Sequence, residues 1–130
     1  TLAECGGFMF LTDSIETTDG NRYEMVGIIS GDAKMHTKRV ALGYREISGR
    51  QGNFLINENQ KARGHEFHYS TFEPNIEIQH AYETKGMRGT KLEGCLTHHV
   101  VAGYTHFHFA SCPALVGNWI KFCKEIKAYG

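Results

Sequence analysis

The sequence predicts an α/β fold in a single domain, and three observations support this prediction. The chain has 130 residues, which is the length of one domain. Several short segments alternate apolar and polar residues with the period of two that is typical of β-strands, and turns containing Gly or Asn separate them. The last segment carries its apolar residues at helical spacing, so we expect one closing helix.

In the first part of the chain, residues 4–10 predict a sharp turn that leads into a buried helix, because the Cys-Gly-Gly sequence at 5–7 precedes an apolar run. Residues 13–23 are polar, and the Asp-Gly-Asn sequence at 19–21 predicts a loop or a hairpin tip. An apolar segment follows at 25–29.

In the middle of the chain, residues 40–47 predict a strand, residues 48–53 a turn, and residues 54–56 a second extended segment. Residues 64–70 alternate residue types, as expected of a strand whose two faces differ, and Pro74 is expected to close this strand.

In the last third, residues 76–82 alternate again and predict a strand, whereas the glycine-rich residues 85–94 predict a loop. Residues 100–109 predict one apolar strand. The closing helix is predicted over 113–129, where a Ser-Cys-Pro sequence at 111–113 is typical of an N-cap followed by Pro in the first turn.

Composition and charge restrict the possible functions. Lys and Arg together number 14, and Asp and Glu together also number 14, so the formal net charge is zero. Binding to nucleic acid or to anionic membranes by bulk charge is therefore disfavoured. No apolar run approaches the 18 residues of a membrane-spanning helix. The four cysteines, at positions 5, 95, 112 and 123, form no C-x-x-C pair, so we expect reduced thiols in a cytoplasmic protein.

Cys5 is the first candidate for chemistry. A thiol at a turn between a strand and a helix, followed by two glycines, fits a nucleophile elbow, in which a nearby backbone N–H faces the reaction centre. The start of the following helix is expected to lower the pKa of the thiol. The alternative is a small cysteine buried in a packed turn.

Histidines supply the second set of candidates. His106 and His108 share one face of the predicted strand and suit a base with a companion, or two metal ligands, or structural histidines. His80, His98 and His99 lie nearby in the sequence, but no carboxylate or cysteine stands at a familiar zinc spacing, so we predict no metal site.

Glu66 and His68 lie in a G-H-E-F-H sequence that differs from the zinc motif H-E-x-x-H, because its histidines are one residue too close. On a strand these two side chains point to one side, where they could orient a base, hold a substrate or pair with each other. Two other hypotheses stay open, namely an N-terminal hydrolase that uses Thr1 as its nucleophile and a histidine-rich metal-binding module.

Four segments taken in order, at 3–11, 41–45, 63–70 and 93–111, resemble one family over nearly the whole chain. The chain is similar to the C-terminal glutamine amidotransferase domain of the cobyrinate a,c-diamide synthase family, a class I-like amidotransferase of cobalamin biosynthesis. The resemblance implies a flavodoxin-like α/β domain. It also implies that Cys5 attacks the glutamine side-chain amide to form a thioester and release ammonia.

The resemblance further implies that His106 is the general base and acid, with His108 in reserve, and that the N–H of Gly6 forms part of the oxyanion hole. Class I relatives place a carboxylate two residues after the catalytic histidine. His108 stands there, so a Cys-His dyad is expected.

Three further residues receive supporting roles in this comparison. Glu66 and His68 are expected to shape the glutamine pocket or to orient His106. Arg39 could bind the α-carboxylate of glutamine, or it could be a solvated surface arginine.

The family also uses ATP and magnesium, in an N-terminal synthetase domain that activates corrinoid carboxylates. No G-x-x-x-x-G-K-S/T motif occurs in this chain, so nucleotide and corrinoid are expected to bind elsewhere in the parent protein. Relatives that amidate cobyric acid, nickel-sirohydrochlorin or a cell-wall intermediate are the alternative. Because the chain starts at Thr1 without Met, we expect it to be the later part of the domain and to show little glutaminase activity alone.

Overall fold

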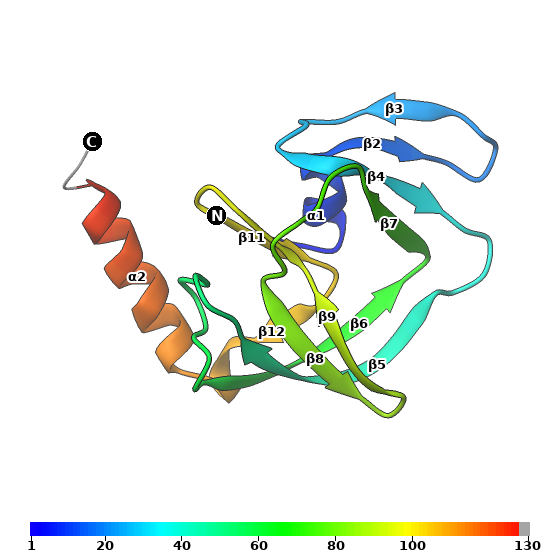
Figure 1. The fold of residues 1–130 in the computed structure, drawn as a ribbon. Helices are drawn as coiled ribbons and strands as arrows, with labels where there is room; N and C mark the ends of the chain where they lie inside the picture. Colours follow the sequence, from blue (N-terminus) through cyan, green and yellow to red (C-terminus); the bar gives the residue numbers. More distant parts are fainter. Residues whose placement is uncertain (128–130) are drawn as a thin grey trace.

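The first sheet brings the start of the chain beside a segment near its end. The computed structural model describes residues 1–127, and the strands of these residues form three sheets (Figure 1). The order of the first sheet is β1 (Leu2–Glu4), β11 (Val100–Gly103), β10 (Cys95–Thr97). β1 runs parallel to β11, with Glu4 opposite Gly103, so the residue after β1 lies next to the end of β11.

The second sheet has five strands, and all neighbouring strands in it are antiparallel. Its order is β12 (His106–His108), β6 (Lys61–His68), β5 (Ala41–Gly49), β8 (Tyr82–Gly86), β9 (Gly89–Glu93). Exposed and buried residues alternate strictly along β6. His65 and Phe67 therefore lie on the exposed face, and Glu66 and His68 on the buried face.

The third sheet packs with the short helix α1 (Gly6–Leu11), which is drawn among its strands in Figure 1. Its order is β3 (Arg22–Glu24), β2 (Thr12–Glu16), β4 (Ile29–Met35), β7 (Ser70–Pro74). Phe8 of α1 is buried, and its ring meets those of Phe72 and Tyr104 edge-on at 5.0 and 5.1 Å. This contact fixes the helix that follows Cys5.

The closing helix α2 (Ala114–Lys127) follows a 3₁₀ turn, η1 (Phe109–Ser111), and lies at one side of the sheets (Figure 1). Leu115 is fully buried in the larger apolar cluster, which also contains Ile47 and Val101. The amide of Asn118 donates to the carbonyl of Leu55 at 2.9 Å. No helix within residues 1–127 has the length and apolar character needed to cross a membrane.

Several predicted elements are confirmed. A helix follows the turn at Cys5, a strand covers 41–49, and the alternating segment at 64–70 spans most of β6 and the first residue of β7. β7 ends at Pro74, as predicted. The closing helix is confirmed to Lys127, and the predicted end at Tyr129 lies outside the described residues.

Two other predicted strands are wrong. Residues 54–56 form no strand, since the Asn53 side chain accepts the N–H groups of Leu55 and Ile56 at 2.9 and 3.1 Å. Residues 76–81 form no strand either, and the ladder starts at Tyr82.

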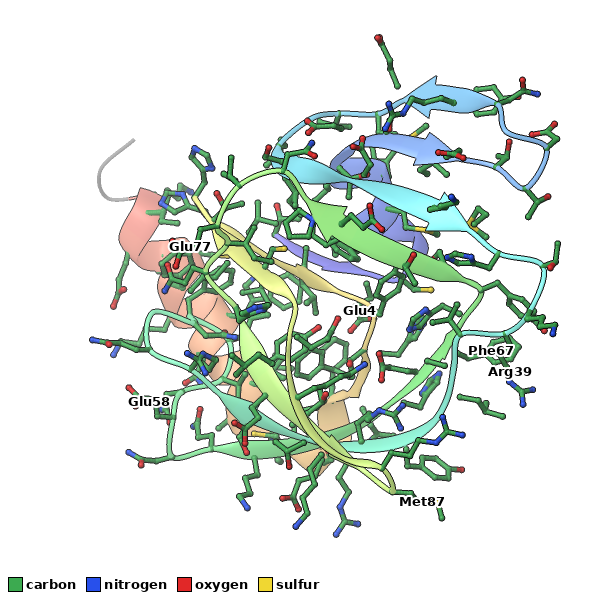
Figure 2. The ribbon with its side chains drawn as sticks, turned by 45° about the vertical axis from the view of Figure 1, so that its right-hand side comes forward. Glu4, Arg39, Glu58, Phe67, Glu77 and Met87 are labelled. Atoms are coloured by element: carbon green, nitrogen blue, oxygen red, sulfur yellow. The ribbon has the colours of Figure 1, made fainter. Side chains whose placement is uncertain are left out.

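The glycine-rich segment 85–94 was expected to be a loop, but most of it is the β8–β9 hairpin. Figure 2 shows Met87 projecting at the tip of this hairpin. The expected strand at 100–109 is broken after Gly103, and its two parts lie in different sheets. The hairpin tip predicted at 19–21 is confirmed, because these residues lie in the turn that joins β2 to the antiparallel β3. The strands β2, β3 and β4 themselves were not predicted.

Candidate active site

Cys5 lies at a sharp turn between β1 and α1. Its backbone has φ 50° and ψ −106°, a left-handed conformation that residues other than glycine adopt rarely. Two hydrogen bonds hold it: the Cys5 N–H donates to the Gly103 carbonyl at 2.8 Å, and the Cys5 carbonyl accepts the Met9 N–H at 3.0 Å. A strained residue held in this way is typical of a functional position.

The sulfur of Cys5 is half-buried and lies 4.0 Å from the carbonyl oxygen of Phe67. Burial raises the pKa of the Cys5 thiol, the Gly6 N–H opposes this shift, and the charge of Glu4 adds to it. The net effect is a raised pKa of the thiol, so the lowering that was expected from the start of α1 is outweighed. A thiol with a raised pKa needs a base to become a nucleophile.

His106 lies on β12, with its ring stacked on that of His65 at 4.8 Å between centroids. Its Nδ1 is 3.8 Å from Oε2 of Glu4, the residue before Cys5. The other oxygen of Glu4 accepts the N–H of Phe107 at 3.0 Å. Glu4 therefore connects the strand of the cysteine to the strand of the histidine, and Figure 2 shows it near the centre of the molecule.

Glu93 fixes the turn that leads into β12. Its carboxylate is buried and accepts the Tyr104 N–H at 2.6 Å and the Thr105 hydroxyl at 3.0 Å. A Cβ added to Gly103 would lie 2.1 Å from the Tyr82 hydroxyl, so this turn requires glycine. Burial raises the pKa of Glu93. The two buried contacts explain why the predicted single strand breaks here.

The protein-family model of the CobB/CobQ-like glutamine amidotransferase domain matches residues 1–114. The chain belongs to this family. The predicted class, an α/β glutamine amidotransferase domain, is thereby confirmed.

Three curated relatives share one name. A cobyrinate a,c-diamide synthase of Priestia megaterium is 59% identical over 127 residues, which cover 98% of the chain and 28% of that relative. Proteins of the same name from Thermoplasma volcanium and Salmonella typhimurium are 39% and 34% identical, over 95% of the chain in both cases. The chain spans 27% and 28% of their lengths.

In this amidotransferase domain, the structure places Glu66 and His68 away from His106. Both lie on the buried face of β6, whereas His106 stacks on the exposed face. Glu66 is fully buried, and Arg45, Lys91 and His68 contact its carboxylate at 2.6, 3.1 and 3.2 Å. Burial disfavours the charge, but the hydrogen bond with His68, the charge of Lys91 and the bond from Arg45 lower the pKa of Glu66 to about 2.

His68 completes this buried network. Its Nδ1 faces the carbonyl of Ser70 at 2.9 Å, and its ring stacks on Tyr104 at 3.8 Å. Both ring nitrogens therefore face oxygen atoms, of Ser70 and of Glu66. The network anchors β6 to β5 and β9, while the predicted role in orienting His106 finds no contact among the described residues.

His108 lies on β12 opposite Arg63 and is exposed. It borders a groove of about 750 Å³ on the outer face of the second sheet. The ionisable residues that line this groove are mostly basic: Arg45, Arg63, Lys85, His65, His108 and the acidic Glu46. Cys5 and His106 are not among the residues that line this groove.

Arg39 is exposed in the loop between β4 and β5. Figure 2 shows it at the same edge of the molecule as Phe67, whose carbonyl lies beside the Cys5 sulfur. Its binding of the glutamine α-carboxylate stays a prediction.

The remaining histidines do not gather into a metal site. His80 faces the Gly94 carbonyl, and His99 packs against Phe122. Within residues 1–127, no group of three His, Cys, Asp or Glu side chains is arranged to hold a metal ion.

Sequence reasoning found Cys5 and His106 from their motifs but gave no role to Glu4. The available signal was its position directly before Cys5 in the A-E-C-G-G sequence. Its partner Phe107 is 103 residues away, so no local pattern could identify the contact.

Proposed function

We propose that this chain is the glutaminase part of an ATP-dependent cobyrinate a,c-diamide synthase, in which it supplies ammonia for amidation of the corrinoid a and c carboxylates. The observation that supports this proposal is the strained backbone of Cys5, together with the contacts that the preceding Glu4 makes to His106 and Phe107. The identity of 59% to the Priestia megaterium protein supports the choice of parent enzyme.

The chemistry starts from the raised pKa of Cys5, which keeps the thiol protonated at neutral pH. His106 takes this proton, and the sulfur attacks the amide carbon of the glutamine side chain. The Gly6 N–H faces the sulfur and suits the oxygen that becomes negative. His106 then gives its proton to the leaving nitrogen, which departs as ammonia and leaves a thioester on Cys5.

In the second half of the reaction, His106 removes a proton from water, and the resulting hydroxide attacks the thioester carbon. The carbon–sulfur bond breaks, glutamate leaves, and the proton returns to the sulfur. No oxidant, reductant or metal enters this balance.

Packing does not require a glycine at position 6. A Cβ added to Gly6 would meet nothing within 4 Å outside its two chain neighbours and the backbone of α1. Glycine here leaves the space beside its N–H open, which supports its proposed place in the oxyanion hole.

ATP, Mg²⁺ and the corrinoid are assigned to the rest of the parent protein. The chain spans about 28% of the Priestia megaterium relative and contains no G-x-x-x-x-G-K-S/T motif. We place the protein in the cytoplasm and expect little glutaminase activity from this chain alone.

The test uses the full-length protein and a diazoketone analogue of glutamine that alkylates the attacking thiol. We expect the adduct on Cys5 by peptide mass mapping, and Cys5→Ser should lose glutaminase activity while retaining amidation driven by free ammonia. Cys123→Ser, at the exposed cysteine of α2, is the matched control and should react as the wild type does. An adduct that persists in Cys5→Ser excludes the proposal.

The same assay separates the two histidines. Because general base catalysis contributes about 10²- to 10⁴-fold, His106→Ala should lower kcat for glutamine hydrolysis by at least ~100-fold. His108→Ala should stay within about threefold of the wild type, since His108 borders the groove and not the cysteine. If His108→Ala lowers kcat more than His106→Ala does, then His108 and not His106 is the general base.

A further inference from the structure

Glu4 contacts His106, and the reaction proposed above assigns no role to Glu4. Its carboxylate lies between β1 and β12, with one oxygen on the Phe107 N–H at 3.0 Å and the other 3.8 Å from Nδ1 of His106. Both side chains are half-buried, with relative exposures of 25% and 34%. The bond from Phe107 fixes the carboxylate, and this orients its second oxygen toward the imidazole.

The carboxylates of Glu66 and Glu93 contact groups other than His106. Glu66 is buried on the opposite face of β6, where Arg45, Lys91 and His68 contact it. Glu93 accepts from Tyr104 and Thr105. The position two residues after His106 holds His108, so it offers no carboxylate.

We propose that Glu4 is the positioning residue of His106: it holds the imidazole with Nδ1–H toward the carboxylate and leaves Nε2 free to take the proton of Cys5. The inference rests on the proposed function. The stacking of His65 on His106, at 6° between the ring planes, holds the ring against rotation from its other side.

The chemistry favours this assignment. A separation of 3.8 Å is longer than a hydrogen bond, but catalytic contacts are often long before substrate binds and then shorten. When His106 takes the thiol proton, the negative charge of Glu4 stabilises the imidazolium. The same charge disfavours the thiolate, so a carboxylate here suits a site that stabilises its base rather than its free thiolate.

The experiment compares Glu4→Gln with the wild type in the full-length protein. The amide oxygen can still accept from Phe107, but the charge is lost. We expect kcat for glutamine hydrolysis to fall about 10- to 100-fold, because the base is misplaced, while KM for glutamine changes less than twofold. Glu16→Gln on β2, a carboxylate of similar exposure at 3.9 Å from Lys34, is the matched control and should leave kcat unchanged.

A spectroscopic readout separates positioning from general stability and does not depend on activity. The ¹⁵N shifts of the His106 ring should show the Nδ1–H tautomer in the wild type and a mixture in Glu4→Gln. Glu4→Asp, which keeps the charge on a shorter side chain, should recover part of kcat. A predominantly Nε2–H ring in the wild type overturns the proposal, even if Glu4→Gln fails to fold.

Two activity results are also decisive. Wild-type kcat in Glu4→Gln overturns the role of Glu4 while leaving the proposed function intact. Glutaminase activity that survives in Cys5→Ser contradicts the proposed function itself, and in that case the tautomer still reports whether Glu4 orients His106.

Discussion

At the residue scale, Glu66 of the second sheet has a carboxylate that three side chains contact. Its neighbours Arg45, Lys91 and His68 surround a side chain that is fully buried. Removing one member of such a buried cluster leaves the others without compensation. The cluster therefore couples β5, β6 and β9 through charge.

This cluster predicts how stability depends on pH. The pKa of Glu66 is about 2 in the folded chain, against an ordinary value of 4.5. A lowered pKa stabilises the fold fully above pH 4.5, and this contribution disappears as pH falls from 4.5 toward 2. A difference of this size corresponds to roughly 3 kcal/mol, since one pKa unit is about 1.4 kcal/mol.

Urea unfolding at several pH values, on the wild type and Glu66→Gln, measures this contribution. We expect the variant to lose about 3 to 5 kcal/mol at pH 7, and the difference between the two proteins should shrink as the pH approaches 2. Glu58→Gln, at an exposed carboxylate, is the control and should change little. A difference that stays constant with pH would contradict the assignment.

At the element scale, β12 lies against β6 where β6 carries a glycine. A Cβ added to Gly64 would be 2.1 Å from the carbonyl oxygen of His106, so Gly64→Ala must push β12 away. We expect lower stability and at least about a tenfold loss of glutaminase kcat in the full-length protein, because misplacing a base by ~1 Å is costly.

The control for this change is Gly117→Ala on α2. A Cβ added to Gly117 would meet nothing within 4 Å outside its two chain neighbours and the backbone of α2. Alanine in a helix is favoured over glycine by up to about 1 kcal/mol. Gly117→Ala should therefore stabilise the protein slightly and leave kcat unchanged. Equal kcat in the two variants would show that the approach of β12 to β6 does not determine the position of His106.

The same elements show what sequence can predict. The turn at Cys5 and helix α2 follow from neighbouring residues, so local patterns identify them. The break at Gly103 depends on buried contacts of Glu93, which lies on another strand. The loop at 54–56 depends on the neighbouring side chain of Asn53, a local contact that the apolar pattern of these residues did not indicate. The β8–β9 hairpin is rich in glycine partly because Arg45 packs over Gly86, where a Cβ would lie 2.9 Å from its guanidinium.

In the candidate site too, local sequence identifies some residues and not others. Cys5 and His106 each stand in a short recognisable motif, and family resemblance suffices to name them. The contact of Glu4 with Phe107 forms only when the fold brings β1 and β12 together. Glu66 and His68 were expected to shape the glutamine pocket or to orient His106, and the alternation along β6 places them on the face away from His106.

At the scale of the whole molecule, α2 packs on the rest of the chain through the buried Leu115, with further contacts from Asn118, Trp119 and Phe122. Leu115 is fully buried, whereas its neighbour Val116 is 42% exposed. Leu115→Ala is expected to cost about 2 to 5 kcal/mol of unfolding free energy by leaving a cavity, and Val116→Ala should cost much less. Urea unfolding of both variants tests this. Similar costs would mean that α2 is held by its exposed face as well.

The contact between Glu4 and Phe107 joins residues that are 103 positions apart. Ribosomes add about 5–20 residues per second, so Cys5 is synthesised about 5 to 20 s before the strand that carries His106. During this interval the backbone of Cys5 lacks the carbonyl of Gly103 that holds it in the folded chain. The strained conformation of Cys5 can therefore form only when the strands near the end of the chain are in place.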